Sequence, residues 1–277
     1  MNFEDKNTCI KELKGVLIVN TMFDFTGKVA VVTGASAGLG ADAALAYAEA
    51  GADVAILARR KEKLEGVRDE IIKKTGRRVI AVQCDVTNEE MVKNAIKTVL
   101  DTFGKIDILL NNAGIAEHCA VVDATEEDWD RVFDTNVKSI FLTCKYVIPQ
   151  MLERGYGKVV NIASVNAIVA DKSDIFIRHS YNSSKAAVLG LTKGMAASYA
   201  QYGITVNAIG PALFETEMTA ERLFKSEEFL SLYSYMNPSS RPGNKGELNG
   251  TILYFSSDAS SYVQGQFVVV DGGGSIV

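Results

Sequence analysis

The strongest constraint on the fold of this chain is a regular alternation of short β-branched runs with longer segments of helical character. The run 29–33 is continuously apolar and ends at a glycine, which is typical of a strand buried on both faces of a sheet. The alanine-rich segment 41–50 follows and stops at Gly51, as a helix with a C-terminal glycine does. Thr87 and Glu90 have the spacing of a capping box, which predicts the start of a later helix. The pattern predicts further strands at 53–58, 79–84, 106–110, 158–163, 205–209 and 266–270, and helices at 61–74, 87–103, 126–153 (two segments), 181–202 and 246–257.

Strands that alternate with helices at this rhythm predict an α/β fold, with a parallel sheet of about seven strands and helices on both faces. Right-handed crossovers bring the carboxyl ends of the strands to one edge of the sheet, where ligands bind. The sequence contains no long internal repeat, no low-complexity tract and no proline-rich linker. We therefore expect an N-terminal extension at 1–26 and a single domain at 27–277.

Composition excludes several classes of protein. The 277 residues carry 29 Lys+Arg and 34 Asp+Glu, so the net charge is −5, and a nucleic-acid partner is not expected. No apolar run approaches the ~18 residues of a membrane span. The four cysteines are scattered and have no histidine at ligand spacing, so we expect buried thiols, no disulfide and no metal. No targeting signal is visible in 1–26, which predicts a cytoplasmic protein whose extension docks on the domain or on a neighbouring subunit.

A glycine-rich turn follows the first predicted strand. The segment 33–40 reads TGASAGLG, and it lies between a buried strand and an alanine-rich helix. Glycines there allow a tight turn and a close approach of backbone amides to a pyrophosphate at the helix N-terminus. The alternative is a glycine-rich turn with no ligand, but the strand-to-helix context favours a dinucleotide and hence a single-domain, Rossmann-type, doubly wound sheet. The residues expected to contact it here are Gly34, Ser36, Gly38, Leu39 and Gly40.

Two further segments end predicted strands at the same edge of the sheet. Asp85 and Val86 follow the third strand, and Asn112, Ala113 and Gly114 follow the fourth. Alone, the first would be read as an Asx turn and the second as an ordinary loop. Together with the glycine turn they outline a pocket for the adenosine part of a dinucleotide.

The end of the second predicted strand bears on which dinucleotide is bound. Arg59 and Arg60 stand where a carboxylate would bind the ribose 2′-hydroxyl of NAD, and no acid occurs before Glu62. A guanidinium matches a phosphate, so we expect NADP to be preferred, with NAD possible. Ala37 supplies no basic side chain to the glycine turn, and the two arginines could instead be solvated residues at a helix start.

The candidate chemical groups are Ser164, Tyr181 and Lys185. Ser164 ends the fifth predicted strand, and Tyr181 and Lys185 lie one helical turn apart, on the same face. A phenol serves as an acid–base group near neutrality only if its pKa is lowered, and an adjacent ammonium has that effect. A lone Y-x-x-x-K would more often be a packed tyrosine and a solvated lysine, because the pattern is common.

The order of TGxxxGxG, NNAG, Asn136 within a helix, Ser164 and YNSSK resembles the short-chain dehydrogenase/reductase family over about residues 24 to 274. The resemblance implies an NAD(P)-dependent oxidoreductase that moves a hydride reversibly between nicotinamide and a secondary alcohol or ketone. It implies a catalytic tetrad of Asn136, Ser164, Tyr181 and Lys185. Ser164 would hold the substrate oxygen and Tyr181 would pass the proton. Lys185 would lower the tyrosine pKa and bind the nicotinamide ribose, and Asn136 would position a water beside it.

The resemblance extends to the rest of the domain. It implies that Tyr181, Lys185, Pro211, Phe214 and Thr216 also contact the cofactor, that 211–242 forms the substrate loop and helices, and that the enzyme is a homotetramer. Two departures stand out. The family commonly has Pro-Gly after the sixth strand, where this chain has Gly-Pro at 210–211, and the gap from Ser164 to Tyr181 is longer than usual for the family.

The small-molecule substrate is the least constrained part of the prediction. Dense apolar residues in 213–236 favour a bulky, partly apolar acid such as a hydroxysteroid or bile acid, although amphipathic helices packing on the core would explain most of them. A sugar acid of the gluconate type and a 3-oxoacyl chain are the alternatives, and a non-catalytic dinucleotide-sensing scaffold is the alternative of another class. Ser164, Arg178 and Tyr181 are the candidate substrate residues. Arg178 could grip a carboxylate, or it could pair with Asp171 or Asp174 or face water.

Overall fold

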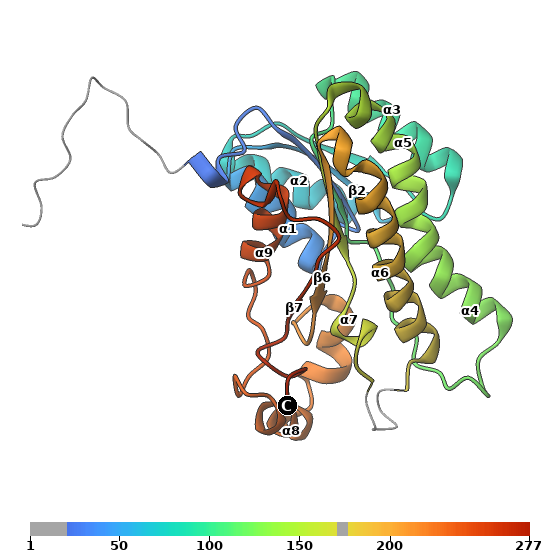
Figure 1. Ribbon diagram of the computed structural model, residues 1–277. Helices are drawn as coiled ribbons and strands as arrows, with labels where there is room; N and C mark the ends of the chain where they lie inside the picture. Colours follow the sequence, from blue (N-terminus) through green and yellow to red (C-terminus); the bar gives the residue numbers. More distant parts are fainter. Residues whose placement is uncertain (1–20, 171–176) are drawn as a thin grey trace, which may run out of the picture.

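The computed structural model describes residues 21–170 and 177–277, and its centre is the predicted parallel sheet (Figure 1). All strand pairs are parallel, and the order is β3-β2-β1-β4-β5-β6-β7. This order reverses direction between β1 and β4, which is the switch point where ligands bind in such sheets. The strands are β1 Val29–Thr33, β2 Asp53–Ala58, β3 Val79–Gln83, β4 Ile108–Asn111, β5 Gly157–Ile162, β6 Ile204–Pro211 and β7 Phe267–Val270.

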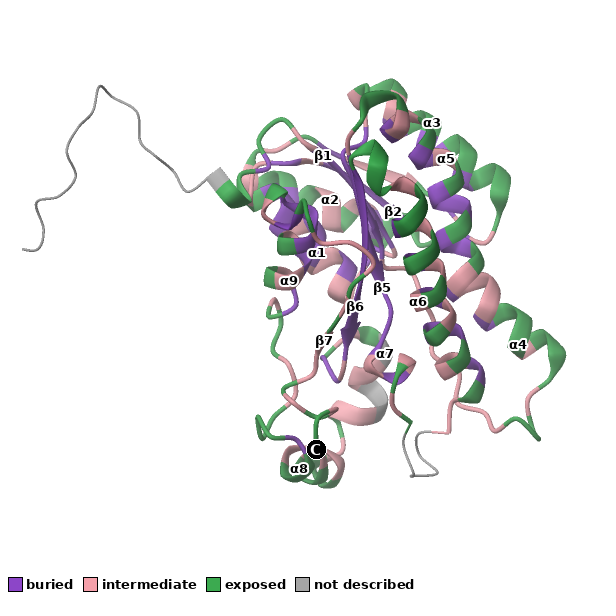
Figure 2. Ribbon diagram, in the orientation of Figure 1, coloured by how far each residue is buried: buried purple, intermediate pink, exposed green. Residues whose placement is uncertain are grey.

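Helices cover both faces of the sheet, and the central strands β1, β4, β5 and β6 are buried between them (Figure 2). One face is covered by α1 Gly38–Glu49, α2 Lys61–Thr75 and α9 Asn249–Ser256. The other is covered by α3 Glu89–Phe103, α5 Ser139–Arg154 and α6 His179–Tyr199. The remaining elements are α4 Glu126–Phe133, α7 Glu217–Thr219, α8 Glu227–Met236, the π turns Asp134–Lys138 and Ala220–Phe224, and the 3-10 turns Thr21–Phe23, Val165–Ala167, Ala200–Tyr202 and Asp258–Ser260. No helix within the described ranges is long and apolar enough to cross a membrane.

The predicted helices are present in the structure, and one predicted N-cap is wrong. Gly76 and Gly104 end α2 and α3 in the left-handed conformation, as a glycine stop requires. The start of α3 is capped by Asn88 and not by the expected pair of Thr87 and Glu90. The Asn88 side chain accepts a hydrogen bond from the backbone N–H of Met91, because Thr87 is engaged by the carboxylate of Asp85.

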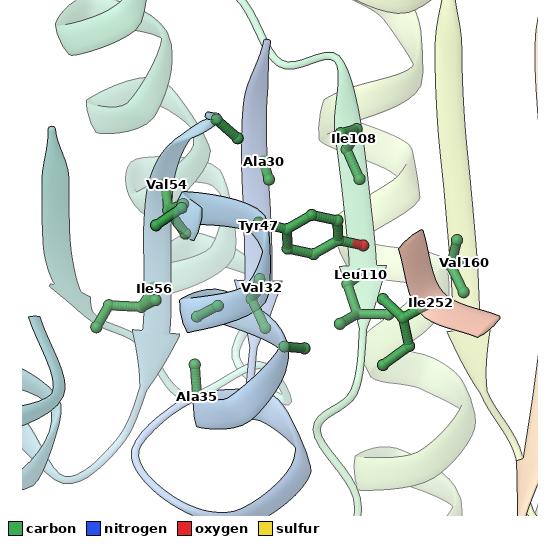
Figure 3. Packing of buried hydrophobic residues seen from close by; sticks show 14 of the residues in the cluster. Ala30, Val32, Ala35, Tyr47, Val54, Ile56, Ile108, Leu110, Val160 and Ile252 are labelled. Atoms are coloured by element: carbon green, nitrogen blue, oxygen red, sulfur yellow. The ribbon is translucent and has the colours of Figure 1, made fainter. Parts of the chain in front are cut away.

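A tyrosine in α1 lies within the apolar layer between the sheet and helices α1, α2 and α9 (Figure 3). Tyr47 is fully buried, and its ring meets that of Phe25 edge-on at 5.9 Å. Its hydroxyl shares a hydrogen bond of 2.7 Å with Ser256 Oγ in α9. Phe25, near the end of the predicted extension, is therefore part of the core, whereas residues 1–20 lie outside the described residues.

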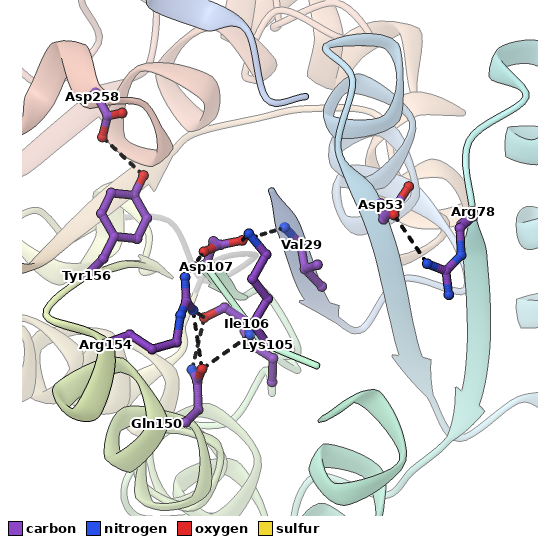
Figure 4. Close-up of polar contacts among 10 residues, drawn as sticks. All are labelled: Val29, Asp53, Arg78, Lys105, Ile106, Asp107, Gln150, Arg154, Tyr156 and Asp258. Carbon is purple, nitrogen blue, oxygen red and sulfur yellow. Dashed lines mark hydrogen bonds and ion pairs between the residues drawn. The ribbon is translucent and has the colours of Figure 1, made fainter. Parts of the chain in front are cut away.

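The amino-terminal edge of the sheet is fixed by a buried carboxylate (Figure 4). Asp107, just before β4, accepts the backbone N–H of Val29 at 2.9 Å and pairs with Lys105 and Arg154. These bonds join the starts of β1 and β4, the two strands that flank the switch point. The carboxyl ends of the same strands are left to form the ligand edge.

Tyr47→Phe should lower the free energy of unfolding by about 1–3 kcal/mol, because it leaves the buried hydroxyl of Ser256 without the partner described above. Urea denaturation followed by circular dichroism measures this loss. Tyr262→Phe is the matched control, since that side chain is fully exposed. Equal stability of the two variants would contradict the assignment of a stabilising bond to Tyr47.

Candidate active site

The glycine turn between β1 and α1 has the conformation that the sequence predicts. Gly34 and Gly38 have φ of +67° and +56°, a region that side chains with a Cβ rarely adopt. A Cβ on Gly34 would also lie 2.8 Å from the Cα of Ala113. Glycine is required here both for the turn and for the contact with the exit of β4.

Asn112 ties the exit of β4 to this turn. Its side-chain amide donates to the backbone oxygen of Thr33 at 2.9 Å, and the Thr33 hydroxyl accepts the backbone N–H groups of Asn112 and Ala113 at 3.0 Å each. A Cβ on Gly40 would collide with that amide. Gly40 is therefore needed for close packing, and its role differs from the conformational role of Gly34.

The first turn of α1 is open to a ligand. Its N-cap residue is Ala37, which provides no side-chain cap, so side chains do not satisfy the N–H groups at this helix end. Such groups, together with the helix dipole, bind phosphate. Gly34, Gly38 and Leu39 line the adjoining cavity, so this cradle fits the pyrophosphate of a dinucleotide.

The two candidate arginines lie in different surroundings. Arg60 lines the cavity and donates to the hydroxyl of Ser36 in the glycine turn at 2.9 Å. Arg59 is exposed and is not among the lining residues, and its backbone oxygen accepts a bond from Gln83. Only Arg60 is therefore placed beside the cradle.

Two predicted adenosine contacts are set back from the cavity. Asp85 forms the Asx turn that was the alternative interpretation, with its carboxylate accepting the backbone N–H and hydroxyl of Thr87 at 3.0 and 2.8 Å. Val86 is buried in the core on the α3 side of the sheet. Neither residue lines the cavity, so their contact with a dinucleotide stays a prediction.

The cavity of about 780 Å³ continues from the glycine turn to the candidate chemical groups. Tyr181 and Lys185 lie one turn apart on α6, with the ammonium nitrogen 5.7 Å from the centre of the phenol ring. Lys185 is 4% exposed and donates to the backbone oxygen of Ile162 at 3.0 Å. Burial lowers its pKa to about 8. The cavity also contacts Ala113, Gly114, Pro211, Phe214 and Thr216, as the sequence predicts.

Asn136 is held in the π turn between α4 and α5, and its amide is fully engaged. The oxygen accepts the backbone N–H of Ile115 at 2.8 Å, and the nitrogen donates to the Ile115 oxygen at 2.9 Å and to Ser184 Oγ at 3.0 Å. Gly114 separates it from Lys185, because a Cβ there would lie 3.2 Å from the Asn136 oxygen and 3.3 Å from the ammonium. Asn136 and Lys185 therefore lie close to each other, with the glycine at position 114 between them.

The expected lowering of the Tyr181 pKa is wrong for this structure. Burial is the largest influence and raises the pKa of the phenol, while a hydrogen bond with Ser164 and the charge of Arg178 act in the opposite direction. Lys185 is directed to the Ile162 oxygen, and Arg178 lies 5.6 Å from the phenol ring. The cation that opposes burial here is therefore Arg178.

The far end of the cavity combines polar and apolar side chains. Arg178 lines it, while its alternative partners Asp171 and Asp174 lie outside the described residues. The apolar part comes from the region that the sequence singled out, including Leu213, Leu223, Phe229, Leu232 and Met236. Five polar lining residues were not among the predicted site residues, namely Asn166, Glu217, Thr219, Asn237 and Asp271. Only Asn166 had a signal, since it lies two residues after Ser164.

Comparisons with known proteins decide the family. The model of the short chain dehydrogenase family matches residues 28–226. The chain is 37% identical over 252 residues to gluconate 5-dehydrogenase of Gluconobacter oxydans, covering 91% of this chain and 96% of that protein. It is 38% identical over 247 residues to 3-oxoacyl-(acyl-carrier-protein) reductase FabG of Staphylococcus aureus, covering 89% of this chain and 97% of that protein.

A solved structure agrees with these relatives. The gluconate 5-dehydrogenase of Burkholderia cenocepacia J2315, in complex with NADP and tartrate, superposes with a TM-score of 0.86 at 34% identity, covering 92% of this chain and 98% of that one. The chain belongs to the short-chain dehydrogenase family. It is accordingly an oxidoreductase that acts on CH–OH groups, and the scaffold alternative is not supported.

One departure from the common pattern of short-chain dehydrogenases has a structural reason. A Cβ on Gly210 would collide with the ring of Phe267 in β7 and lie 3.2 Å from the carbonyl carbon of Ser164. A larger residue at position 210 would therefore require the Phe267 ring to move, and Pro211 ends β6. Thr216 still reaches the glycine turn, since a Cβ on Gly38 would lie 3.2 Å from the Thr216 Cβ.

Other chemistries find no support in the described residues. No group of three His, Cys, Asp or Glu side chains that could hold a metal occurs in 21–170 and 177–277. Cys84 and Cys144 are buried as free thiols, as predicted, and Cys119 is half-buried. The titratable side chains that line the cavity include those of Arg60, Arg178, Tyr181, Lys185, Glu217 and Asp271.

The low pKa of Lys185 predicts a pH-dependent contribution to stability. Its folded pKa of about 8 lies below the ~10.4 of an unfolded lysine, so the unfolded chain binds more protons between these values. The contribution is therefore fully present above the unfolded pKa and is lost as pH falls to about 8. Urea denaturation of cofactor-free protein should show that wild type gains stability over Lys185→Met as pH rises from 8 to 10. A constant difference would contradict the buried lysine.

Proposed function

We propose that this protein is an NADP-preferring oxidoreductase that interconverts a hydroxyl and a ketone on a sugar acid of the gluconate type. The observation that carries the proposal is the position of Arg178, which lines the same cavity as Tyr181 with its guanidinium carbon 5.6 Å from the phenol ring. A guanidinium at that place can bind the carboxylate of a substrate whose hydroxyl reacts at Tyr181.

The relatives support a sugar acid better than a steroid. Gluconate 5-dehydrogenases appear among both the sequence and the structural relatives, and one of the latter holds tartrate, a small hydroxy acid. Nothing among these relatives supports the expected hydroxysteroid or bile acid. Asn166 is a buried amide beside Ser164 and can bond to a hydroxyl next to the reacting carbon.

The proposed chemistry assigns one task to each group. Bound nicotinamide supplies or accepts the hydride at the reacting carbon. Tyr181 transfers the proton to or from the substrate oxygen, and Ser164, its hydrogen-bond partner, orients that oxygen. Lys185, held by the Ile162 oxygen, binds the ribose, and Asn136 positions the backbone at Ile115 beside it.

The cofactor preference rests on Arg60. It is fixed to the glycine turn by Ser36, so its guanidinium lies where a ribose 2′-phosphate would follow a pyrophosphate seated at the α1 N-terminus. Two gluconate 5-dehydrogenases of known structure were solved with NADP, which supports the same choice. NAD remains a second cofactor, since the parts of the dinucleotide that NAD shares with NADP do not depend on Arg60 for binding.

Tyr181→Phe should lower kcat by about 10²–10⁴, because it removes the group that transfers the proton. Calorimetric binding of NADP⁺ should be retained, since the lost hydroxyl is not needed for the cradle at the α1 N-terminus. Turnover is followed by nicotinamide absorbance under conditions in which chemistry limits the rate. Wild-type turnover in the variant would remove Tyr181 from the reaction.

The substrate class is tested by comparing acids with their esters. Gluconate should be oxidised with NADP⁺ more efficiently than its methyl ester, and Arg178→Ala should remove about 1.5–3 kcal/mol of transition-state binding from the acid beyond any loss on the ester. Arg178 also affects the pKa of Tyr181, and this effect acts on both substrates. Subtracting the loss on the ester therefore removes it from the comparison. Arg241→Ala, an arginine outside the cavity lining, is the control.

Two outcomes would contradict this substrate class. Equal losses on acid and ester would show that Arg178 acts only on the phenol or on its own loop. Turnover of a 3-oxoacyl thioester at a higher kcat/KM than any sugar acid would instead favour 3-oxoacyl reduction, the activity for which the FabG relative is named.

A further inference from the structure

The carboxylate of Glu217 contacts Arg60, the residue proposed to bind the 2′-phosphate of the cofactor. Glu217 begins α7, directly after Thr216, and its two oxygens form ion pairs of 2.6 Å with Arg60 and 2.6 Å with Lys63. Arg60 and Lys63 belong to the start of α2, more than 150 residues away in sequence. The bridge therefore joins the start of α2 to α7, and two of its members, Arg60 and Glu217, line the cavity.

The Arg60 guanidinium forms hydrogen bonds with two partners, Glu217 and Ser36. One terminal nitrogen donates to Glu217, and the other donates to Ser36 Oγ at 2.9 Å. A ribose 2′-phosphate that binds the terminal nitrogen facing Glu217 would replace the Glu217 carboxylate, because both ligands are anions that accept from the same donor. Lys63 and Arg60 also lower the pKa of the Glu217 carboxyl, so it stays negatively charged at neutral pH.

The charge balance shows how strongly this competition acts. Two cations and one carboxylate leave the cluster with a net charge of +1, and without Glu217 the charge would be +2. A phosphomonoester carries nearly two negative charges, so its attraction to the cluster depends directly on that carboxylate. A ribose with a free 2′-hydroxyl carries no such charge, and its binding is insensitive to the difference.

From this geometry we infer that Glu217 is a specificity-determining residue: it occupies Arg60 and Lys63 until a 2′-phosphate displaces it, and so limits how far the enzyme prefers NADP(H) over NAD(H). The inference rests on the proposed function, in which Arg60 reads the 2′-phosphate. With NAD(H) bound, the bridge remains and α7 stays tied to α2. With NADP(H) bound, Glu217 is released from Arg60.

The test measures binding of NADP⁺ and NAD⁺ by titration calorimetry at one fixed ionic strength, without substrate. Glu217→Gln should tighten NADP⁺ binding about 3- to 10-fold relative to NAD⁺, a size expected for an exposed ion pair. Glu215→Gln is the matched control, because Glu215 is an exposed acid two residues away that forms no ion pair with Arg60 or Lys63. The ratio of the two affinities is the readout, since a loosened α7 would weaken both cofactors equally.

Arg60→Ala separates failure of this inference from failure of the proposed cofactor. If Arg60→Ala lowers the NADP⁺/NAD⁺ affinity ratio while Glu217→Gln leaves it at the wild-type value, Glu217 does not determine specificity and the NADP preference stands. If Arg60→Ala leaves the ratio unchanged, the assignment of the 2′-phosphate to Arg60 is wrong, and the inference falls with it. A raised ratio in Glu215→Gln as well would reduce the effect to general surface charge and overturn the inference.

Discussion

The contact between the glycine turn and the exit of β4 is the constraint on which the site depends. Gly34 and Gly40 leave no room for a Cβ because Asn112 and Ala113 pass directly against them. The hydrogen bonds of Thr33 and Asn112 then hold two neighbouring strand exits in one register. Any side chain at these glycines would separate the phosphate cradle from the β4 exit, and with it from Gly114 beside Lys185.

Burial shifts the pKa values of Tyr181 and Lys185 in opposite directions, and both shifts favour the neutral form. The pKa of the Tyr181 phenol is raised and that of the Lys185 ammonium is lowered. In such a site the phenol keeps its proton, and deprotonation of the lysine ammonium costs less free energy than it does in water. Arg178, the residue directly before α6, also places positive charge close to the phenol, with its guanidinium carbon 5.6 Å from the ring centre.

The sequence was sufficient for the sheet and for most of the site because both are encoded locally. Buried strands read as apolar runs, and the glycines and the pair of Tyr181 and Lys185 have fixed spacings along one turn or helix. The predicted cap of α3 is wrong because Asp85 engages Thr87 in the Asx turn that the sequence offers as an alternative. The local sequence gives no signal for the ion pairs of Glu217, since its partners are distant in the chain and only the fold brings them together.

The π turn that carries Asn136 makes the length of this part of the chain as important as its composition. A π turn inserts one residue into an otherwise continuous helix, here between α4 and α5. Deleting a residue from Asp134–Lys138 would remove the wide turn and convert this segment to ordinary α-helix. Asn136 would then face away from Ile115 and Ser184. The number of residues between α4 and α5 is therefore a requirement for the position of Asn136, separate from the identity of the side chain.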